Sequence, residues 1–313
     1  MRSLLALLAA VLAIVPVALA GAVRTVTAPA PVSALAADGP RVAYAAGRSA
    51  ADCNRVYVWN LTTRRVAKLG RKTHCEQTST GNAISGLAIA GNRALWAHYV
   101  GGNTRDWTLW TATTSRPAPT LLDSVSAAAD DAAPILVGNG TTRSGNDLLS
   151  YAVRQEVTGL RSTGARAFRW RSPTRVTAIA SDERHVVVGR SDGTVVLLSE
   201  FGVVSEVYFE GEGAAPATAL ALSAGRLYVQ RGSKLLYSTG DRPDRTLTLP
   251  RGSRLVDAED DRALVVTARG LVQQVEFRPN AVLVRSLGNG RFAQLEPAYT
   301  TAAAGRVVRL LPR

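Results

Sequence analysis

The most constraining feature of the sequence is a short apolar–turn–apolar unit that recurs along the chain. It is clearest between Thr174 and Ser199, where three Val-rich runs are separated by the polar breaks SDER and SDG. Each run has the length of a β-strand, and each break has turn chemistry. The SDG break predicts a tight hairpin, because Gly193 can adopt a positive φ.

This unit returns at spacings that are typical of propeller blades. The first strand of each segment begins near Val32, Ala83, Ala133, Val176, Ala217, Arg254 and Arg291, at intervals of 51, 50, 43, 41, 37 and 37 residues. Periods of this size, each with room for four short strands, belong to β-propellers. The sequence therefore predicts an all-β fold, a seven-bladed β-propeller, in a single domain over residues 21–313. A six-bladed ring is the alternative, in which the weak third segment is an insertion.

The seventh segment is short of one strand. It holds three predicted strands, and the last of them runs from Arg306 to Leu311. The run from Val23 to Thr27, VRTVT, is strand-like and precedes the first blade. Pairing these two runs would supply the missing strand and cover two open sheet edges. We therefore expect the last blade to be closed by the N-terminal strand.

The first 20 residues have the composition of an export leader. Arg2 is followed by an apolar run from Leu4 to Ala20, which ends in a small-x-small cleavage pattern. We expect a signal peptide over residues 1–20 and a mature protein that is secreted or lies in the periplasm or cell envelope. The alternative is an uncleaved anchor, since the apolar run from Leu4 to Val23 could just span a membrane. Only in that case would the membrane be a partner.

The two cysteines, Cys53 and Cys75, are an even pair in a chain that we expect to be exported. Such a pair predicts one disulfide bond. A zinc site that adds His74 and His98 is not expected, because no C-x-x-C pair is present and an oxidising compartment favours the disulfide. We expect neither a metal nor a cofactor.

The chain is strongly basic, with 37 Lys and Arg against 24 Asp and Glu and a formal net charge of +13. The arginines are scattered, without a basic run or interleaved aromatic residues, so a nucleic-acid partner is not expected. Attraction to an extracytoplasmic protein or an anionic polymer is the expectation that this charge supports. We expect the protein to be a monomer.

A short motif resembles a known family. The segment VYVWN at Val56–Asn60, followed by Thr63 and Val66, is similar to the end of the third strand in WD40 repeats, with Trp-Asn where that family often has Trp-Asp. Leu109-Trp110-Thr111 is similar to it one blade later. The chain thus resembles WD40 and related seven-bladed propellers, and this resemblance implies the propeller fold.

The first two blades have the longest periods, and we expect the extra length to lie in loops on the face that carries the two cysteines. Long loops on a rigid β scaffold are where function usually lies. The predicted loops are residues 47–52, 70–81, 101–106 and 123–131. The candidate ligand surface on them consists of His74, Glu76, Arg105, Asp106 and Trp107. The alternative is that these loops are merely solvated and that Trp59, Trp96 and Trp110 belong to the core.

Two motifs resemble functional sites but are not expected to be a catalytic or a calcium site. Gly189–Gly193 matches the G-x-S-x-G pattern, but a nucleophile elbow requires a following helix and here a strand is predicted. His185 is expected to be a core or blade-contact residue instead of its base. The acidic cluster Asp257–Asp261 lacks the spacing of a calcium loop and is expected to be a solvated turn.

The sequence therefore favours an exported, non-catalytic binding or interaction module whose ligand face lies on the loops of the first two blades. The alternative is a propeller-type hydrolase or lyase with its site at the channel mouth. Such an enzyme would need His, Glu or Asp side chains that converge from several blades.

Overall fold

The computed structural model describes residues 25–46, 53–70, 81–128, 131–138, 147–208, 214–240 and 244–311. Within these ranges the regular elements are all β-strands. No membrane-spanning helix occurs among them.

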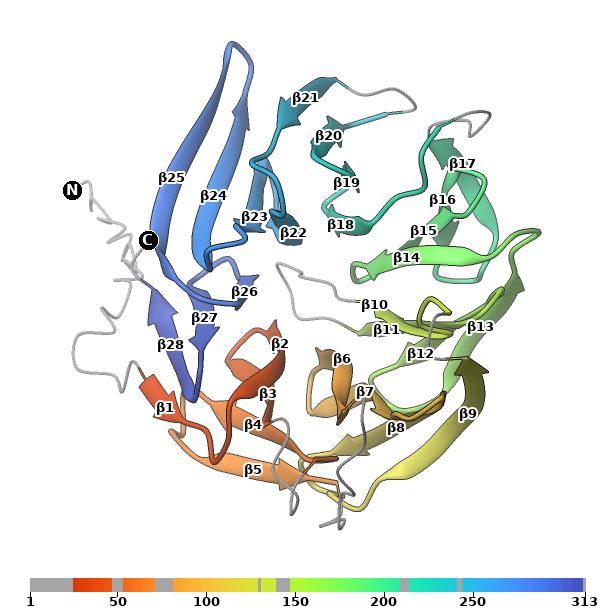
Figure 1. The fold of residues 1–313 in the computed structure, drawn as a ribbon, viewed down its shortest axis with the longest axis vertical. Helices are drawn as coiled ribbons and strands as arrows, with labels where there is room; N and C mark the ends of the chain where they lie inside the picture. Colours follow the sequence, from red (N-terminus) through yellow and green to blue (C-terminus); the bar gives the residue numbers. More distant parts are fainter. Residues whose placement is uncertain are drawn as a thin grey trace, which may run out of the picture.

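The strands form seven antiparallel sheets of four strands each. Figure 1 shows the sheets around a common centre, with β2, β6, β10, β14, β18, β22 and β26 toward the inside. This arrangement fits a seven-bladed propeller, so the predicted all-β architecture is confirmed. The six-bladed alternative is wrong, because the third segment folds into a complete sheet.

We number the sheets 1 to 7 in chain order. Sheet 1 contains β2 (Val32–Asp38), β3 (Arg41–Ala46), β4 (Val56–Asn60) and β5 (Val66–Leu69). Sheet 2 contains β6 (Asn82–Ala90), β7 (Arg93–Val100), β8 (Thr104–Thr113) and β9 (Thr120–Ala128). Sheet 3 contains β10 (Ile135–Gly138), β11 (Leu148–Val153), β12 (Glu156–Arg161) and β13 (Arg166–Arg171).

The remaining sheets follow the same order, except the last. Sheet 4 contains β14 (Val176–Ser181), β15 (His185–Arg190), β16 (Val195–Ser199) and β17 (Val204–Tyr208). Sheet 5 contains β18 (Ala219–Ser223), β19 (Arg226–Arg231), β20 (Lys234–Ser238) and β21 (Arg245–Thr248). Sheet 6 contains β22 (Arg254–Glu259), β23 (Arg262–Val266), β24 (Leu271–Arg278) and β25 (Ala281–Asn289). Sheet 7 contains β26 (Phe292–Leu295), β27 (Thr300–Ala304), β28 (Val307–Leu311) and, outermost, β1 (Thr25–Thr27).

The N-terminal strand pairs with the last strand of the chain. In the antiparallel register Thr25 lies opposite Arg309 and Thr27 lies opposite Val307. The Ala28 N–H, just after β1, donates a hydrogen bond to the Arg306 carbonyl oxygen at 2.7 Å. The predicted pairing of the two terminal runs is therefore present over residues 25–27, and residues 23–24 lie outside the described part.

Neighbouring sheets are held together by apolar packing. Among the described residues, seven hydrophobic clusters each join one pair of adjacent sheets, and the cluster between sheets 7 and 1 includes Leu35, Tyr299 and Val308. Trp59 and Trp96 are buried in two of these clusters. Burial of such large apolar side chains is the main stabilising contribution. Packing thus links sheet to sheet, whereas the hydrogen-bond ladders run within each sheet.

Much of the extra length of sheet 2 is strand and not loop. β8 begins at Thr104 and β9 continues to Ala128, and these two residues lie opposite each other in the ladder. The expectation of loops over residues 101–106 and 123–131 is wrong for these strand residues. The outer strand β9 alternates between exposed and half-buried positions, so its polar sequence lacked the apolar alternation that indicates a strand.

The hairpin chemistry of sheet 4 is as predicted. Gly193 has a φ of 88° in the turn between β15 and β16, a conformation that glycine adopts without a steric penalty. Because a strand follows the turn, Gly189–Gly193 is not a nucleophile elbow.

The acidic cluster on β22 is not a solvated turn. Asp257 and Glu259 are 3% and 1% exposed, and the turn itself is formed by Asp260 and Asp261. The Leu295 N–H of sheet 7 donates a hydrogen bond to Asp257 Oδ2 at 2.7 Å. The expectation was wrong because the partner that makes burial of this carboxylate favourable comes from the next sheet.

Candidate functional site

The inner strands of sheets 1, 2, 6 and 7 line a cavity at one mouth of the central channel. It consists of an outer space of about 870 Å³ and an adjoining inner space of about 180 Å³. Both spaces are lined by residues near the starts of four inner strands: Ser33, Ser85, Arg254 and Phe292. In a propeller this end of the inner strands shares a face with the turns between second and third strands, and the outer space accordingly reaches the β23–β24 turn at Arg269.

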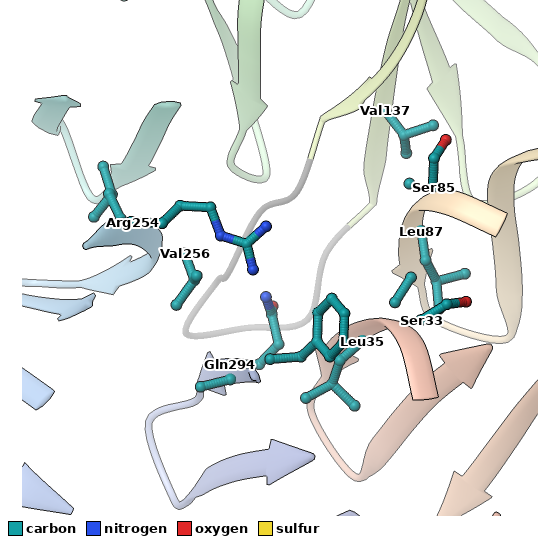
Figure 2. A pocket seen from close by; sticks show the side chains of 13 residues that line it. Ser33, Leu35, Ser85, Leu87, Val137, Arg254, Val256 and Gln294 are labelled. Atoms are coloured by element: carbon teal, nitrogen blue, oxygen red, sulfur yellow. The ribbon is translucent and has the colours of Figure 1, made fainter. Parts of the chain in front are cut away.

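Breaks in strand pairing direct several side chains into this cavity. The register shifts at Ser33 in β2, at Ser85 in β6 and at Val256 in β22. Each shift leaves one residue of the inner strand without a partner opposite, which is the signature of a β-bulge. All three bulged residues line the inner space (Figure 2). The cavity is therefore built by a local irregularity that three sheets share.

The outer space is basic. Arg254, Arg269 and Arg291 line it, and its described lining includes no Asp or Glu. All three side chains are exposed to solvent, and none forms an ion pair within the described part of the chain. Three positive charges around one concave surface concentrate a positive potential there, which attracts anions.

Arg254 is held in a fixed orientation. Its Nη2 donates a hydrogen bond to the Arg291 carbonyl oxygen at 3.2 Å, and its guanidinium carbon lies 5.8 Å from the centroid of the Phe292 ring. Although Arg254 is exposed on the cavity side, partial desolvation by the surrounding protein and the nearby Arg291 charge lower its pKa below the ordinary value. The guanidinium group is thus positioned by sheet 7 while its remaining N–H groups are available to the cavity.

Two polar side chains with unused hydrogen-bonding atoms accompany Arg254. Gln294 is 2% exposed, and its Oε1 has no partner among the described residues; the Ser33 hydroxyl is likewise buried and unpartnered. Figure 2 shows the Gln294 and Arg254 side chains directed into the same inner space. Buried polar atoms normally have a hydrogen-bond partner, so this pair of atoms marks the inner space as a place for a polar ligand.

The site residues predicted from the sequence are only partly described. His74 and Glu76 lie outside the described residues, and so does Cys75. Cys53 is 1% exposed, and its predicted disulfide with Cys75 stays a prediction. The described residues contain no group of three or more His, Cys, Asp or Glu that could hold a metal ion.

The other three predicted residues lie on β8 and have different environments. Trp107 is 5% exposed and packs against Tyr99, with ring centroids 5.3 Å apart. Asp106 is exposed and accepts a hydrogen bond from the Ser126 hydroxyl at 2.6 Å. Arg105 lies over Tyr99, with its guanidinium carbon 5.9 Å from the ring centroid. Trp107 therefore belongs to the core, and ligand binding by Arg105 and Asp106 stays a prediction.

Tyr99 connects these residues to the cavity. It lines the outer space, and it also supports both Arg105 and Trp107. Arg105 and Trp107, from the predicted ligand surface, thus lie next to the arginine-lined outer space of the cavity.

The sequence analysis did not identify the residues that build the cavity. Arg254 is the first residue of β22, and Arg291, 37 residues later, directly precedes β26, the inner strand of the next sheet. Their shared place in the repeat, together with the aromatic residue Phe292, was the available signal.

In sheets 1, 6 and 7 the opposite ends of the inner strands carry four buried carboxylates: Asp38, Asp257, Glu259 and Glu296. The Gly39 N–H of sheet 1 donates to Glu296 Oε2 at 3.0 Å, and the Gly91 N–H of sheet 2 donates to Asp38 Oδ2 at 2.5 Å. Burial, with the nearby Asp257 and Asp38, raises the pKa of Glu296 to about 9. These side chains line neither space of the cavity, and they connect each sheet to the next.

The two described histidines also lie away from the cavity lining. His98 is 6% exposed, its Nε2 lies 2.6 Å from Asn82 Oδ1, and burial lowers its pKa to about 4. His185 is half-exposed and pairs with Asp182, whose hydrogen bond raises the pKa of the imidazole. His185 is therefore a half-exposed residue beside Asp182, so the core position is wrong, and a blade-contact role stays a prediction.

Comparison with known proteins finds similar folds and gives no information about function. No protein-family model matches the chain, and no curated protein matches it in sequence. Among solved structures it is similar to the computationally designed Ika8 protein, with a TM-score of 0.51, 13% identity and coverage of 92% of this chain and 98% of that one. It is also similar to Raptor from Chaetomium thermophilum, with a TM-score of 0.57 and 15% identity over 93% of this chain and 28% of Raptor. At these identities the likeness shows a shared fold alone.

Proposed function

We propose that the protein is an exported, non-catalytic binding module, and that it binds an anionic ligand at the arginine-lined mouth of its channel. The observation that carries this proposal is the set of three arginines, Arg254, Arg269 and Arg291, around one cavity whose described lining has no carboxylate. An anionic ligand would supply the opposite charge that the fold does not provide there.

The residue types in the cavity favour binding over catalysis. The described lining of both spaces includes no His, Asp, Glu, Lys or Cys, so the hydroxyl groups that line it, on Ser33, Ser85 and Thr267, have no such general base beside them in that lining. The hydrolase or lyase alternative therefore draws no support from the described lining of the channel mouth.

The expected partner is an extracytoplasmic protein or an anionic polymer. The export leader, over residues 1–20, lies outside the described residues and supports a secreted or cell-envelope location through its composition alone. The membrane enters as a partner only if the leader is retained. The generic propeller ring, with WD40-like strand endings, would serve as a rigid monomeric frame for the face.

Binding to a defined polyanion tests the proposal. The protein is applied to immobilised dextran sulfate, with neutral dextran as a blank, and eluted with salt. Replacing the three arginines Arg254, Arg269 and Arg291 together by Gln is expected to lower the salt concentration of elution clearly. Salt screens such contacts, so elution reports on the charges at the surface that binds.

A charge-matched control separates this face from the net charge of the chain. Arg166, Arg184 and Arg285 are exposed, have no ion pair within the described residues and do not line the cavity. Their triple Gln variant has the same net charge and is expected to elute near the unmodified protein. Equal elution of the two triple variants would show that the channel mouth is not the binding face.

A further inference from the structure

We propose that the inner space of the cavity is a subsite for a single carboxylate on a short aliphatic stem of a peptide, in which Arg254 binds the carboxylate and Gln294 Oε1 accepts a hydrogen bond from a neighbouring peptide N–H. This inference rests on the function proposed above and names the chemistry of its ligand. It is carried by the bulged inner strands, by the orientation of Arg254 and by the buried Gln294 Oε1, which has no partner among the described residues.

The size of the inner space limits what can enter. Its volume of about 180 Å³ corresponds to roughly six water molecules at liquid density. A group of about that many heavy atoms fits, such as the end of an acidic side chain or a terminal residue. The outer space, at about 870 Å³, leaves room for the adjoining residues of an extended peptide.

Arg254 is placed to contact any group that passes from the outer to the inner space, because it lines both. The Phe292 ring and the Arg291 carbonyl fix the plane of its guanidinium group. A guanidinium fixed in this way presents two parallel N–H donors, the geometry that matches the two oxygens of a carboxylate.

Polar and apolar groups in the inner space then select among anions. The Gln294 amide and the Ser33 hydroxyl offer hydrogen bonds to a peptide amide beside the carboxylate. Leu35, Leu87 and Val137 form an apolar lining, which favours a hydrocarbon stem over the hydroxyls of a sugar acid.

Inorganic phosphate fits this lining less well than a carboxylate does. Arg254 is the only arginine among the described residues that line the inner space. A phosphate dianion would be left with one positive partner and with oxygens against hydrocarbon, which is unfavourable.

Isothermal titration calorimetry with defined probes tests the inference on the full chain. Acetyl-glycyl-glutamate amide provides a side-chain carboxylate, and acetyl-glycyl-glutamine amide is its matched neutral control. Acetyl-glycyl-alanine provides a free C-terminal carboxylate. Glucuronate and inorganic phosphate are the competing anions. We expect at least one carboxylate peptide to bind about tenfold or more tightly than the glutamine peptide, glucuronate and phosphate, as expected when a charged hydrogen bond is lost. The peptide that binds more tightly shows whether the subsite prefers a side-chain carboxylate or a C-terminal one.

Variants of the lining test the named residues. Arg254→Gln is expected to weaken binding of the preferred peptide about tenfold or more, and Arg254→Lys is expected to restore only part of it, since Lys lacks the planar fork. Arg184→Gln, on the exposed turn of sheet 4, is the control that leaves binding unchanged. Gln294→Glu places a carboxylate of the chain itself in the subsite and is expected to abolish binding. Cooperative urea unfolding of each variant shows that it is folded.

The outcomes separate this inference from the proposed function. If both carboxylate peptides bind no better than the glutamine peptide while elution from dextran sulfate still depends on the three arginines, the subsite is overturned and the binding face stands. If a carboxylate peptide binds but folded Arg254→Gln binds it equally well, the assignment of the subsite to Arg254 is overturned. If the preferred ligand is phosphate or glucuronate, the aliphatic stem is wrong.

Discussion

The two ends of the inner strands use charge in opposite ways. At one end Asp38, Asp257 and Glu296 are buried and accept hydrogen bonds from backbone N–H groups of the neighbouring sheet. At the other end Arg254 and Arg291 are exposed in a cavity and form no ion pair within the described residues.

This difference separates a structural role from a binding role on the same strands. A buried carboxylate is tolerated because a neighbouring sheet provides its partners, so its loss exposes those partners. An exposed arginine without a carboxylate contributes little to stability, so its loss is expected to show in ligand binding. The predictions below test this contrast, starting with the largest expected effect.

Asp257→Ala is expected to lower the free energy of unfolding by about 2–3 kcal/mol, because it leaves the buried Leu295 N–H without its acceptor. Urea unfolding at neutral pH measures the effect. Asp257→Asn is the matched control, since it keeps the volume and one acceptor oxygen, and its cost should be smaller. An Ala variant as stable as the original protein would mean that the carboxylate end does not join sheets 6 and 7.

Protonation of Glu296 makes the free energy of unfolding depend on pH, and the direction of this dependence follows from the pKa. Its pKa rises from 4.5 to about 9 in the fold, so the folded state binds this proton more tightly than the unfolded chain does. Its contribution to the free energy of unfolding is therefore full below pH 4.5 and is lost as the pH rises toward about 9. Glu296→Gln resembles the protonated form and can still accept from the Gly39 N–H.

Urea unfolding between pH 5 and 9 tests this sign. The stability of the original protein should fall relative to Glu296→Gln as the pH rises, and the difference should be greatest at the alkaline end. Parallel curves for the two proteins would show that folding does not raise the pKa of Glu296.

Val26→Asp is expected to cost about 1–2 kcal/mol of unfolding free energy, because Val26 is half-buried against the cluster that joins sheets 7 and 1. Thermal unfolding compares it with Thr25→Asp, an exposed position on the same strand. Similar melting temperatures for the two variants would mean that β1 adds no packing at this junction.

Arg254→Gln is expected to change the free energy of unfolding by no more than about 0.5 kcal/mol, as for exposed positions in general. Loss of stacking on Phe292 and relief from the Arg291 charge act in opposite directions. A stability loss as large as that of Asp257→Ala would remove the contrast between the two ends.

The repeat could be predicted from the sequence because six of the seven sheets consist of four consecutive strands. Sheet 4 is formed by consecutive strands between Val176 and Tyr208, so apolar runs and turn residues were sufficient. Asp257 and Glu259 were assigned wrongly because their burial depends on another sheet. The Leu295 donor lies 38 residues away in the chain, beyond the reach of a local pattern.

The candidate site was harder to predict for a similar reason. Arg254, Arg269 and Phe292 are separated in sequence and meet only through the ring. The bulges at Ser33 and Ser85 depend on strand pairing, which composition does not reveal. The predicted ligand surface did not include this cavity, although Tyr99, which supports Arg105 and Trp107, also lines the outer space.

The pairing of β1 with β28 has a consequence for how the protein is made. Synthesis delivers the amino end first, so Thr25–Thr27 exist long before Val307–Arg309, the residues opposite them. The last sheet can therefore be completed only after β28 has been made. A product that terminates before Val307 would leave β1 without its neighbour, and cells could recognise such an unfinished chain by that unprotected segment.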